Sequence, residues 1–299
     1  MPVVGYISAA SRAEVQRHLV AFERGLARMG FVDGKTVRIE YRFAEARFEL
    51  IPTIADEFVR RHVDVICTAN NAGAVAAKAA TSEIPIVFVV GVDPIGLGLV
   101  SEFNRPEGNA TGAAVLASEL EPKRLELLRE LVPEGTLVAA LVNPENPNAR
   151  DHRARLPPAA VALGLHLDVI PVRNAADIDA AFEAMARQGA GAMLATIDPF
   201  LLFQRRKLID LARRSRIRAM YPLRDFVDDG GLISYGNDLA DATQQMGIYA
   251  GRILRGVKPA SLPVQQPTKF ELVVNIGAAK AIGATIPPAI LARADEVIE

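Results

Sequence analysis

Residues 63–94 read VDVICTANNAGAVAAKAATSEIPIVFVVGVDP. This stretch contains an apolar strand, a polar turn, an alanine-rich helix and a second apolar strand that ends in polar residues. Strands that alternate with helices in this way predict a parallel α/β sheet. Ligands of such sheets bind outside the carboxyl ends of the strands, where helix N-termini present backbone N–H groups. The stretch therefore predicts a binding site at its polar ends, with Asn70, Asn71 and Asp93 as candidates.

The same alternation of apolar strands and amphipathic helices continues along most of the chain. The order β-α-β-α-β-α-β occurs twice, and a turn-rich segment at residues 104–112, NRPEGNATG, separates the two repeats. Because strand-helix-strand units are right-handed, each repeat predicts one parallel sheet with helices on its faces. Outside residues 63–94, we expect strands at residues 3–7, 36–42, 113–117, 137–144, 166–171, 190–196 and 218–221, and helices at residues 13–29, 50–61, 122–131, 176–188, 200–214 and 238–255.

The length of the chain also favours two lobes. A chain of 299 residues exceeds what a single hydrophobic core usually supports. Segments near residues 114, 234 and 268 are placed to cross between the two repeats and would form a three-segment hinge. We therefore predict an α/β protein with two Rossmann-like lobes, each built on a parallel sheet. Lobe 1 would take residues 1–114 and 236–267, and lobe 2 would take residues 115–235 and 268–299.

The charge of the chain argues against a polyanionic partner. Its 34 basic and 35 acidic side chains nearly cancel, and no long run of one sign occurs. A protein that binds nucleic acid carries a basic patch or stripe. No apolar run reaches the roughly 20 residues of a membrane span. We therefore expect no nucleic-acid partner and no membrane-spanning segment in this sequence.

Residues typical of catalytic and metal sites are scarce. Cys67 lies inside the apolar run DVICTA, where a small buried hydrophobe is expected rather than a nucleophile, and one cysteine forms no internal disulfide. The four histidines, at positions 18, 62, 152 and 166, lack the spacing of helical metal ligands, and we expect them on the surface. The GxSxG, phosphate-loop, HExxH and CxxC motifs are missing. The sequence thus predicts no catalytic residue, no metal site and no cofactor.

Polar residues at the predicted strand ends are the candidates for ligand binding. Amides at a helix start suit a carboxylate, and an aspartate suits an ammonium group. Aromatic side chains would form the apolar walls of the site, namely Tyr6, Phe88, Phe200, Tyr221 and Tyr235. The candidates are Ser8, Ser11, Asn70, the backbone N–H groups of Asn71, Ala72, Gly73 and Ala74, and Asp93 from the first half, with Asn143, Asp198, Tyr221 and Tyr235 from the second.

Each candidate also has a structural alternative. Asn70 or Asn71 would cap a helix, since asparagine is a preferred N-cap residue. Asp93 and Asp198 both precede a proline, which is typical of turns and helix starts. Tyr221 and Tyr235 would pack against the core with exposed hydroxyls. The residues alone leave these alternatives open.

Several motifs together resemble the family of ABC-transporter substrate-binding proteins that includes tryptophan- and phenylalanine-binding members. The resemblance covers nearly the whole chain and implies a type I periplasmic-binding fold without enzymatic activity. The motifs are AFERGLARMGFVDGKTVRIEYRFAE (21–45), IPIVFVVGVDPIGLGLV (84–100), RPEGNATG (105–112), KRLELLRELVP (123–133), LVNPENPNA (141–149), GGLISYG (230–236), LPVQQPTKFELVVN (262–275) and IPPAILARADEVIE (286–299).

The resemblance implies a receptor that captures a small molecule between two closing lobes and presents it to an ABC permease in the membrane. We expect a carboxylate-bearing ligand, either an amino acid or an aromatic acid. Its carboxylate would meet residues 70–74 and Ser8, and its amine would meet Asp198 or Asp93. We expect the receptor to be a monomer.

Two other functions are weighed against this receptor. An enzyme of the two-lobe α/β type, such as a racemase or lyase, needs a matched acid and base across its cleft, and Cys67 and the histidines are badly placed for that. The sensor domain of a repressor-like protein shares the fold but needs a DNA-binding helix-turn-helix ahead of Val3.

The start of the sequence bears on location. It reads MPVVGYIS, directly on a predicted strand, without the basic and apolar regions of a secretory signal. Taken alone, this start suggests either a cytoplasmic protein or the mature form of an exported one. The resemblance implies a secreted or lipid-anchored protein, so we expect a periplasmic or extracytoplasmic location.

Overall fold

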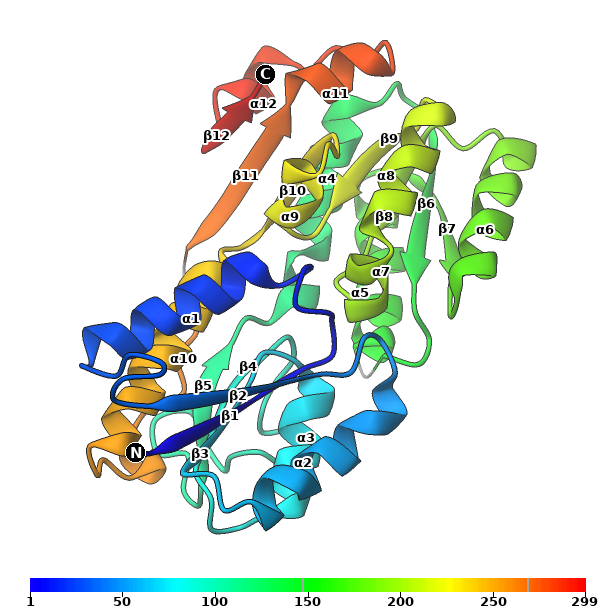
Figure 1. Cartoon of the computed structure of the whole chain (residues 1–299). Coiled ribbons are helices and arrows are strands. Elements are labelled where there is room, and N and C mark those ends of the chain that lie inside the picture. Colours follow the sequence, from blue (N-terminus) through cyan, green and yellow to red (C-terminus); the bar gives the residue numbers. More distant parts are fainter. Residues whose placement is uncertain (147, 268) are drawn as a thin grey trace. The chain divides into compact units, whose positions relative to one another are not determined.

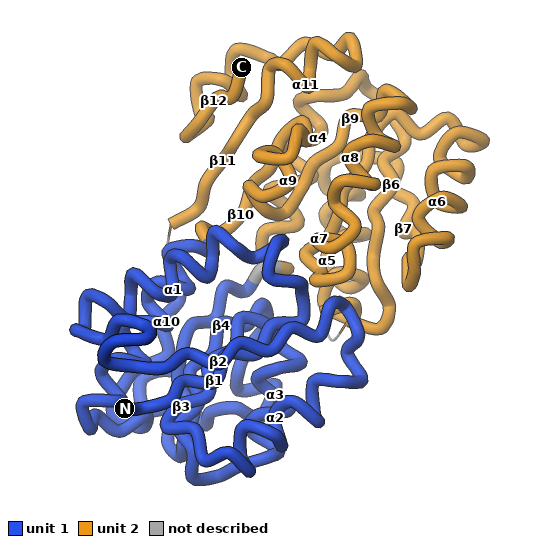
Figure 2. Tube along the Cα trace, in the orientation of Figure 1, with its two compact units in different colours: residues 1–116, 239–268 blue, residues 117–238, 269–299 orange. Residues whose placement is uncertain are grey.

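The computed structural model describes residues 1–146, 148–267 and 269–299. The chain divides into two compact units, unit 1 (Met1–Leu116 with Leu239–Thr268) and unit 2 (Ala117–Asp238 with Lys269–Glu299), drawn in blue and orange in Figure 2. It therefore passes from one unit to the other three times. The lobe boundaries expected from the sequence, residues 1–114 with 236–267 and residues 115–235 with 268–299, stay a prediction.

Unit 1 is built on a five-stranded sheet in which every strand pair is parallel. The strand order is β2-β1-β3-β4-β5, so the order along the chain reverses between β1 and β3. In open α/β sheets this reversal point opens a crevice at the carboxyl ends of the strands. The strands are β1 (Val3–Ser8), β2 (Arg38–Phe43), β3 (Val65–Thr68), β4 (Ile86–Val90) and β5 (Ala110–Ala114).

Helices cover both faces of the unit 1 sheet (Figure 1). Helices α2 (Ile51–Arg60) and α3 (Asn71–Ala80) lie on one face, next to the short helix η1 (Phe48–Leu50). Helices α1 (Gln16–Arg28) and α10 (Leu239–Leu254) lie on the other, and η3 (Pro259–Ser261) contacts β5.

Two glycines allow α1 and α10 to approach closely. A Cβ at Gly25 would lie 2.1 Å from the Gln244 carbonyl oxygen, and one at Gly247 would lie 2.2 Å from the Phe22 carbonyl oxygen. Any larger residue at either position would force the two helices apart.

Unit 2 repeats this plan and extends it. The order β7-β6-β8-β9-β10 matches that of unit 1, and β11 and β12 continue the sheet beyond β10. β11 runs antiparallel to β10, which departs from the purely parallel sheet expected from the sequence, while the other pairs are parallel. The strands are β6 (Leu137–Val142), β7 (His166–Pro171), β8 (Ala192–Ala195), β9 (Arg218–Tyr221), β10 (Ile233–Asn237), β11 (Phe270–Asn275) and β12 (Glu296–Ile298).

The helices of unit 2 also lie on two faces. Helices α4 and α5 pack together against one apolar cluster, and α6 contacts α8 on the other face (Figure 1). The helices are η2 (Ala117–Leu120), α4 (Glu121–Leu131), α5 (Ala149–Ala162), α6 (Ala175–Gln188), α7 (Pro199–Phe203), α8 (Arg205–Arg214), α9 (Arg224–Asp228), α11 (Ile276–Ala281) and α12 (Pro288–Leu291).

Two expectations from the sequence are wrong, one about a helix and one about the histidines. The helix expected at residues 200–214 is two helices that meet at Gln204, where the Arg205 side chain donates to the Leu202 carbonyl and bonds Asp229. Of the four histidines, His18 and His152 are buried and only His62 and His166 are exposed. Cys67 is buried as expected, and burial raises the pKa of its thiol.

Candidate functional site

The turn after β3 is organised by Asn70. Its backbone is extended, and its side-chain oxygen accepts a hydrogen bond from the Gly73 N–H at 2.6 Å, which caps α3. Its amide nitrogen donates to Thr68 Oγ1 at 3.0 Å and to the Ile7 carbonyl at 3.5 Å. Asn70 thus caps the helix and links the carboxyl ends of β3 and β1, which are the two strands at the reversal point of unit 1.

Asn71 and Gly73 fix the rest of this turn. The side-chain oxygen of the buried Asn71 accepts from the Gly91 N–H at 2.8 Å, so it ties the start of α3 to the turn after β4. A Cβ at Gly73 would lie only 2.2 Å from Thr68 Oγ1, so this position requires glycine. The carboxyl ends of β1, β3 and β4 are therefore joined by side-chain bonds at one edge of the sheet.

Part of the expected carboxylate site is already used inside the turn. The Gly73 N–H donates to the Asn70 side chain, and the Ala74 N–H donates to the Asn70 carbonyl at 3.2 Å. Ala72 is half-buried beside them. The turn thus offers an anion fewer donors than the sequence suggests.

The other candidates of unit 1 also have local partners. Ser8 Oγ donates to the Ala10 carbonyl at 3.0 Å and accepts from the Ala10 N–H at 3.2 Å. The Ser11 N–H donates to the Glu14 carboxylate at 2.9 Å. Asp93 is exposed and accepts from the Ile95 and Gly96 N–H groups at 3.1 and 3.2 Å, as in an aspartate turn.

In unit 2, Asp198 and Asn143 meet at the equivalent reversal point, between β6 and β8. Asp198 caps α7 by accepting from the Leu201 N–H at 2.9 Å, and it accepts from the Asn143 and Asn146 side chains at 3.2 and 2.5 Å. Only 4% of Asp198 is exposed. Burial raises the pKa of its carboxyl group, and the bonds from Asn146, Leu201 and Asn143 act in the opposite direction.

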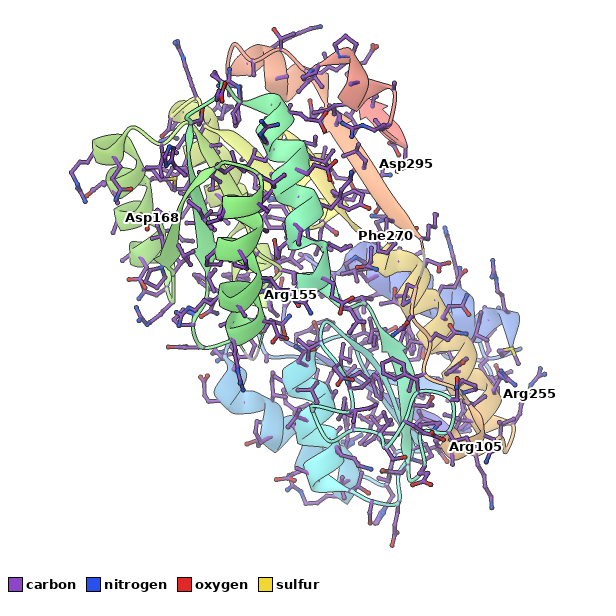
Figure 3. All side chains as sticks on the ribbon, turned by 180° about the vertical axis from the view of Figure 1, so that it is seen from behind. Arg105, Arg155, Asp168, Arg255, Phe270 and Asp295 are labelled. Atoms are coloured by element: carbon purple, nitrogen blue, oxygen red, sulfur yellow. The ribbon has the colours of Figure 1, made fainter. Side chains whose placement is uncertain are left out.

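The tyrosines of unit 2 make aromatic contacts. Tyr221 is 1% exposed at the end of β9, its ring stacks on Phe226 at 4.7 Å, and burial raises its pKa. Tyr235 in β10 is half-buried, and its ring lies 6.2 Å from that of Phe270, which begins β11 and is labelled in Figure 3.

The expected apolar walls divide into two groups. Tyr6 and Phe88 are enclosed in the core of unit 1, where Tyr6 makes an edge contact with Phe22, and their role as walls of a site stays a prediction. Phe200 is 8% exposed and lies in α7, next to its capping residue Asp198.

A buried ionic cluster in unit 2 was not expected from the sequence. Arg124 Nη1 lies 3.2 Å from Glu121 Oε1, and His152 Nδ1 lies 2.8 Å from the same oxygen. Arg124 Nε also donates to the Tyr235 carbonyl at 2.7 Å, and burial lowers the pKa of its guanidinium. The spacing of Arg124, Leu128 and Leu131 along α4 is a signal that this face is buried. The cluster anchors the start of α4 to β10.

Nothing in the described part of the chain suggests metal chemistry or a membrane span. No group of three or more histidine, cysteine, aspartate or glutamate side chains there is arranged to hold a metal ion. Among the same residues, every helix is too short or too polar to cross a membrane.

Known proteins with the same fold are similar over almost the full length. The chain resembles a "Tyrosine-binding protein" of Clostridioides difficile, with 22% identity over 279 residues, 93% of this chain and 80% of that protein. A conserved domain protein from Vibrio cholerae O1 biovar eltor has a TM-score of 0.91 and 29% identity, with 99% of each chain covered. An ABC domain in complex with L-Trp from Streptococcus pneumonia has a TM-score of 0.88 and 24% identity, again with 99% of each chain covered.

A family model decides the assignment. The model described as "ABC transporter substrate binding protein" matches residues 3–298, and the two α/β units agree with the fold of the similar structures. The chain belongs to the family of ABC transporter substrate-binding proteins.

Proposed function

We propose that the chain is the solute receptor of an ABC importer and that its ligand is an amino acid or an aromatic acid bearing a carboxylate. The observation that carries the proposal is the family match over residues 3–298. Proteins of this family bind substrates and are not enzymes. A tyrosine-binding relative and an L-Trp complex among the similar structures favour an aromatic amino acid.

Unit 1 supplies the donors for the ligand's carboxylate in this proposal. The cap of α3 is the neutral Asn70, so the positive end of the helix dipole is not cancelled by a carboxylate at that position. An anion near the first turn of α3 gains from this field. The residues expected to contribute are Ser8, Ser11 and the segment 70–74.

An aspartate supplies the acceptor for the ligand's amine. A carboxylate has about four acceptor positions. Asp198 accepts three recorded hydrogen bonds and is almost completely buried, whereas Asp93 accepts two and is exposed. Asp93 therefore retains more capacity for an ammonium group. Asn143, Tyr221 and Tyr235 stay proposed contacts of unit 2.

Calorimetric titration of ligand-stripped protein tests the ligand class. We expect L-Trp, L-Tyr, L-Phe or an aromatic acid to bind with a dissociation constant near micromolar, which corresponds to about 8 kcal/mol. Tryptamine and tyramine, which lack the carboxylate, serve as matched controls and should bind at least 10-fold more weakly, as loss of one charge-assisted contact implies. If none of the acids binds below millimolar, the ligand class is wrong.

The transport role needs a separate test. ABC substrate-binding proteins are extracytoplasmic in general, and we propose a periplasmic or other extracytoplasmic location and a permease partner for this chain. In proteoliposomes that contain a candidate permease and its ATPase, the liganded receptor should stimulate ATP hydrolysis. Light scattering during size-exclusion chromatography should give the mass of one chain, 32.1 kDa. A liganded receptor that never stimulates ATP hydrolysis would refute the importer role.

A further inference from the structure

Arg12 is a side chain of unit 1 that the proposed site has not used. It follows the carboxyl end of β1 by four residues, and its guanidinium carbon lies 4.6 Å from the centre of the Tyr41 ring and 5.5 Å from that of Phe43. Tyr41 and Phe43 belong to the carboxyl half of β2, and their rings stack 6.1 Å apart with planes 12° from parallel. The cation therefore lies at the edge of the sheet where ligands of α/β folds bind.

The aromatic platform under Arg12 is itself held in place. The Tyr41 hydroxyl donates to the Glu23 carboxylate on α1 at 2.7 Å, and the Tyr41 ring contacts that of Tyr6. Burial and this bond to Glu23 raise the pKa of Tyr41. A guanidinium stacked on an aromatic face keeps its N–H groups available at the edge of its plane. The two rings therefore form a platform under an exposed cation, whose N–H donors stay accessible.

The acidic groups closest to Arg12 along the chain and on its platform are engaged elsewhere. Glu14 accepts hydrogen bonds from both the backbone and the side chain of Ser11, and Glu23 accepts from Tyr41. In the part of the chain that the structure describes, no carboxylate lies within ion-pair distance of the exposed Arg12 guanidinium. An oriented arginine without an acidic partner at a ligand-binding edge calls for an anion.

We propose that Arg12 binds the carboxylate of the ligand through paired hydrogen bonds from its guanidinium. This inference rests on the proposed function and gives the carboxylate a partner other than the turn at the start of α3. That turn has used its Gly73 and Ala74 amides, whereas a guanidinium offers five donors in a planar fork that matches a carboxylate. Arg12 thereby distinguishes acids from neutral analogues of the same shape.

Two ligands and three variants test the assignment by calorimetric titration. The ligands are L-Trp and L-tryptophanamide, in which a neutral amide replaces the carboxylate. Arg12→Gln should weaken L-Trp binding by about 10- to 100-fold, as expected for loss of a charge-assisted pair, and should leave amide binding within about 2-fold. Arg28→Gln removes an exposed arginine from the far end of α1 and should leave both affinities unchanged. Asn70→Asp keeps an acceptor for the cap and adds a negative charge at the start of α3.

The outcomes separate the two proposals. If neither L-Trp nor the other aromatic acids bind the unmodified protein, the proposed function fails and the inference falls with it. If L-Trp binds the unmodified protein and Arg12→Gln equally well, only the inference is overturned. If Asn70→Asp weakens L-Trp binding more than Arg12→Gln does, the carboxylate lies at the α3 turn and Arg12 is not its partner. Thermal unfolding of the two arginine variants should stay near that of the unmodified protein, because both arginines are exposed.

Discussion

Asn70 and Asp198 occupy the same position in the two units. Each follows by two residues a threonine at or just after the end of a strand, in Thr68-Ala69-Asn70 and Thr196-Ile197-Asp198, and each caps the next helix through the backbone N–H three residues later. Each also lies at the point where its sheet reverses strand order. Asn70 is neutral and half-buried, whereas Asp198 is an acid that is almost completely buried.

The two caps differ in the hydrogen bond that the preceding threonine makes. Thr196 Oγ1 donates back to the Leu141 carbonyl at 2.8 Å, and the first turn of α7 carries Leu201 at the position where α3 carries Gly73. Thr68 Oγ1 accepts from Asn70 and occupies the space beside Gly73. One sequence pattern therefore gives a half-buried turn with a neutral cap in unit 1 and a buried acidic network in unit 2. Chemistry at equivalent positions does not follow from topology alone.

The largest expected effect comes from breaking the acidic network. Asp198→Ala removes the acceptor of three hydrogen bonds, two of which come from the side chains of the buried Asn143 and the half-buried Asn146. We expect a loss of about 3 kcal/mol in the free energy of unfolding. Urea denaturation measures it, with Asp93→Ala as the exposed control at about 0.5 kcal/mol. Equal losses in the two variants would contradict the claim that the buried network around Asp198 contributes more to stability than the exposed aspartate turn at Asp93.

Gly73→Ala tests the crowding beside Thr68. The added Cβ would lie 2.2 Å from Thr68 Oγ1 and 3.0 Å from the Asn70 side-chain oxygen, so the cap must shift. We expect about 2 kcal/mol of destabilisation, as is typical when a packed site is overfilled. Thermal and urea unfolding check this value. The double variant with Thr68→Ala, which removes the obstructing hydroxyl, should recover part of the loss relative to Thr68→Ala alone.

Asn70→Ala removes only a cap that is partly exposed to solvent. Loss of an N-cap side chain costs about 1 kcal/mol. We therefore expect Asn70→Ala to destabilise the protein roughly a third as much as Asp198→Ala, in the same denaturation series. A loss as large as that of Asp198→Ala would show that the link from Asn70 to the Ile7 carbonyl is as important as the whole network in unit 2.

The smallest effect concerns pH. Burial raises the pKa of Asp198 in the folded state, so the folded protein holds this proton to a higher pH than the unfolded chain does. The free energy of unfolding, taken relative to Asp198→Asn, should therefore fall as the pH rises from about 3.9, the ordinary value for aspartate, through the folded pKa. Urea denaturation of both proteins between pH 4 and pH 7 measures the difference. A difference that increases with pH would mean that the hydrogen bonds outweigh burial.

Regular elements were predictable from sequence because their signals are local. The apolar runs at residues 65–68 and 86–90 and the helix between them follow from periodicity, and a family resemblance over most of the chain fixed the class of fold and of function. The burial of His152 was not predictable, because it depends on Glu121, which is 31 positions earlier in the chain. From the sequence alone, a histidine in a polar helix is expected to be exposed. Only the packing of the folded chain shows that His152 is buried.

The candidate site divides in the same way. Strand ends identified Asn70, Asn143 and Asp198, since a parallel sheet brings its carboxyl ends to one edge. Which of these side chains already has partners could not be read from sequence, because an asparagine that caps a helix and one that faces a ligand occupy the same sequence position. Arg12 escaped notice because its platform lies on β2, about thirty residues further along the chain.

The pairing of α1 with α10 has a consequence for how the protein is made. Gly25 and Gly247 meet across this pair, and α10 also contacts β3, β4 and β5. During synthesis, residues 117–238 emerge from the ribosome before α10 does, so the first five strands wait with one face incompletely covered. Contacts between segments so distant in sequence slow folding and leave apolar surface open to aggregation or to chaperones. Unit 2 interrupts unit 1, and the late arrival of a single helix sets when the first unit can be completed.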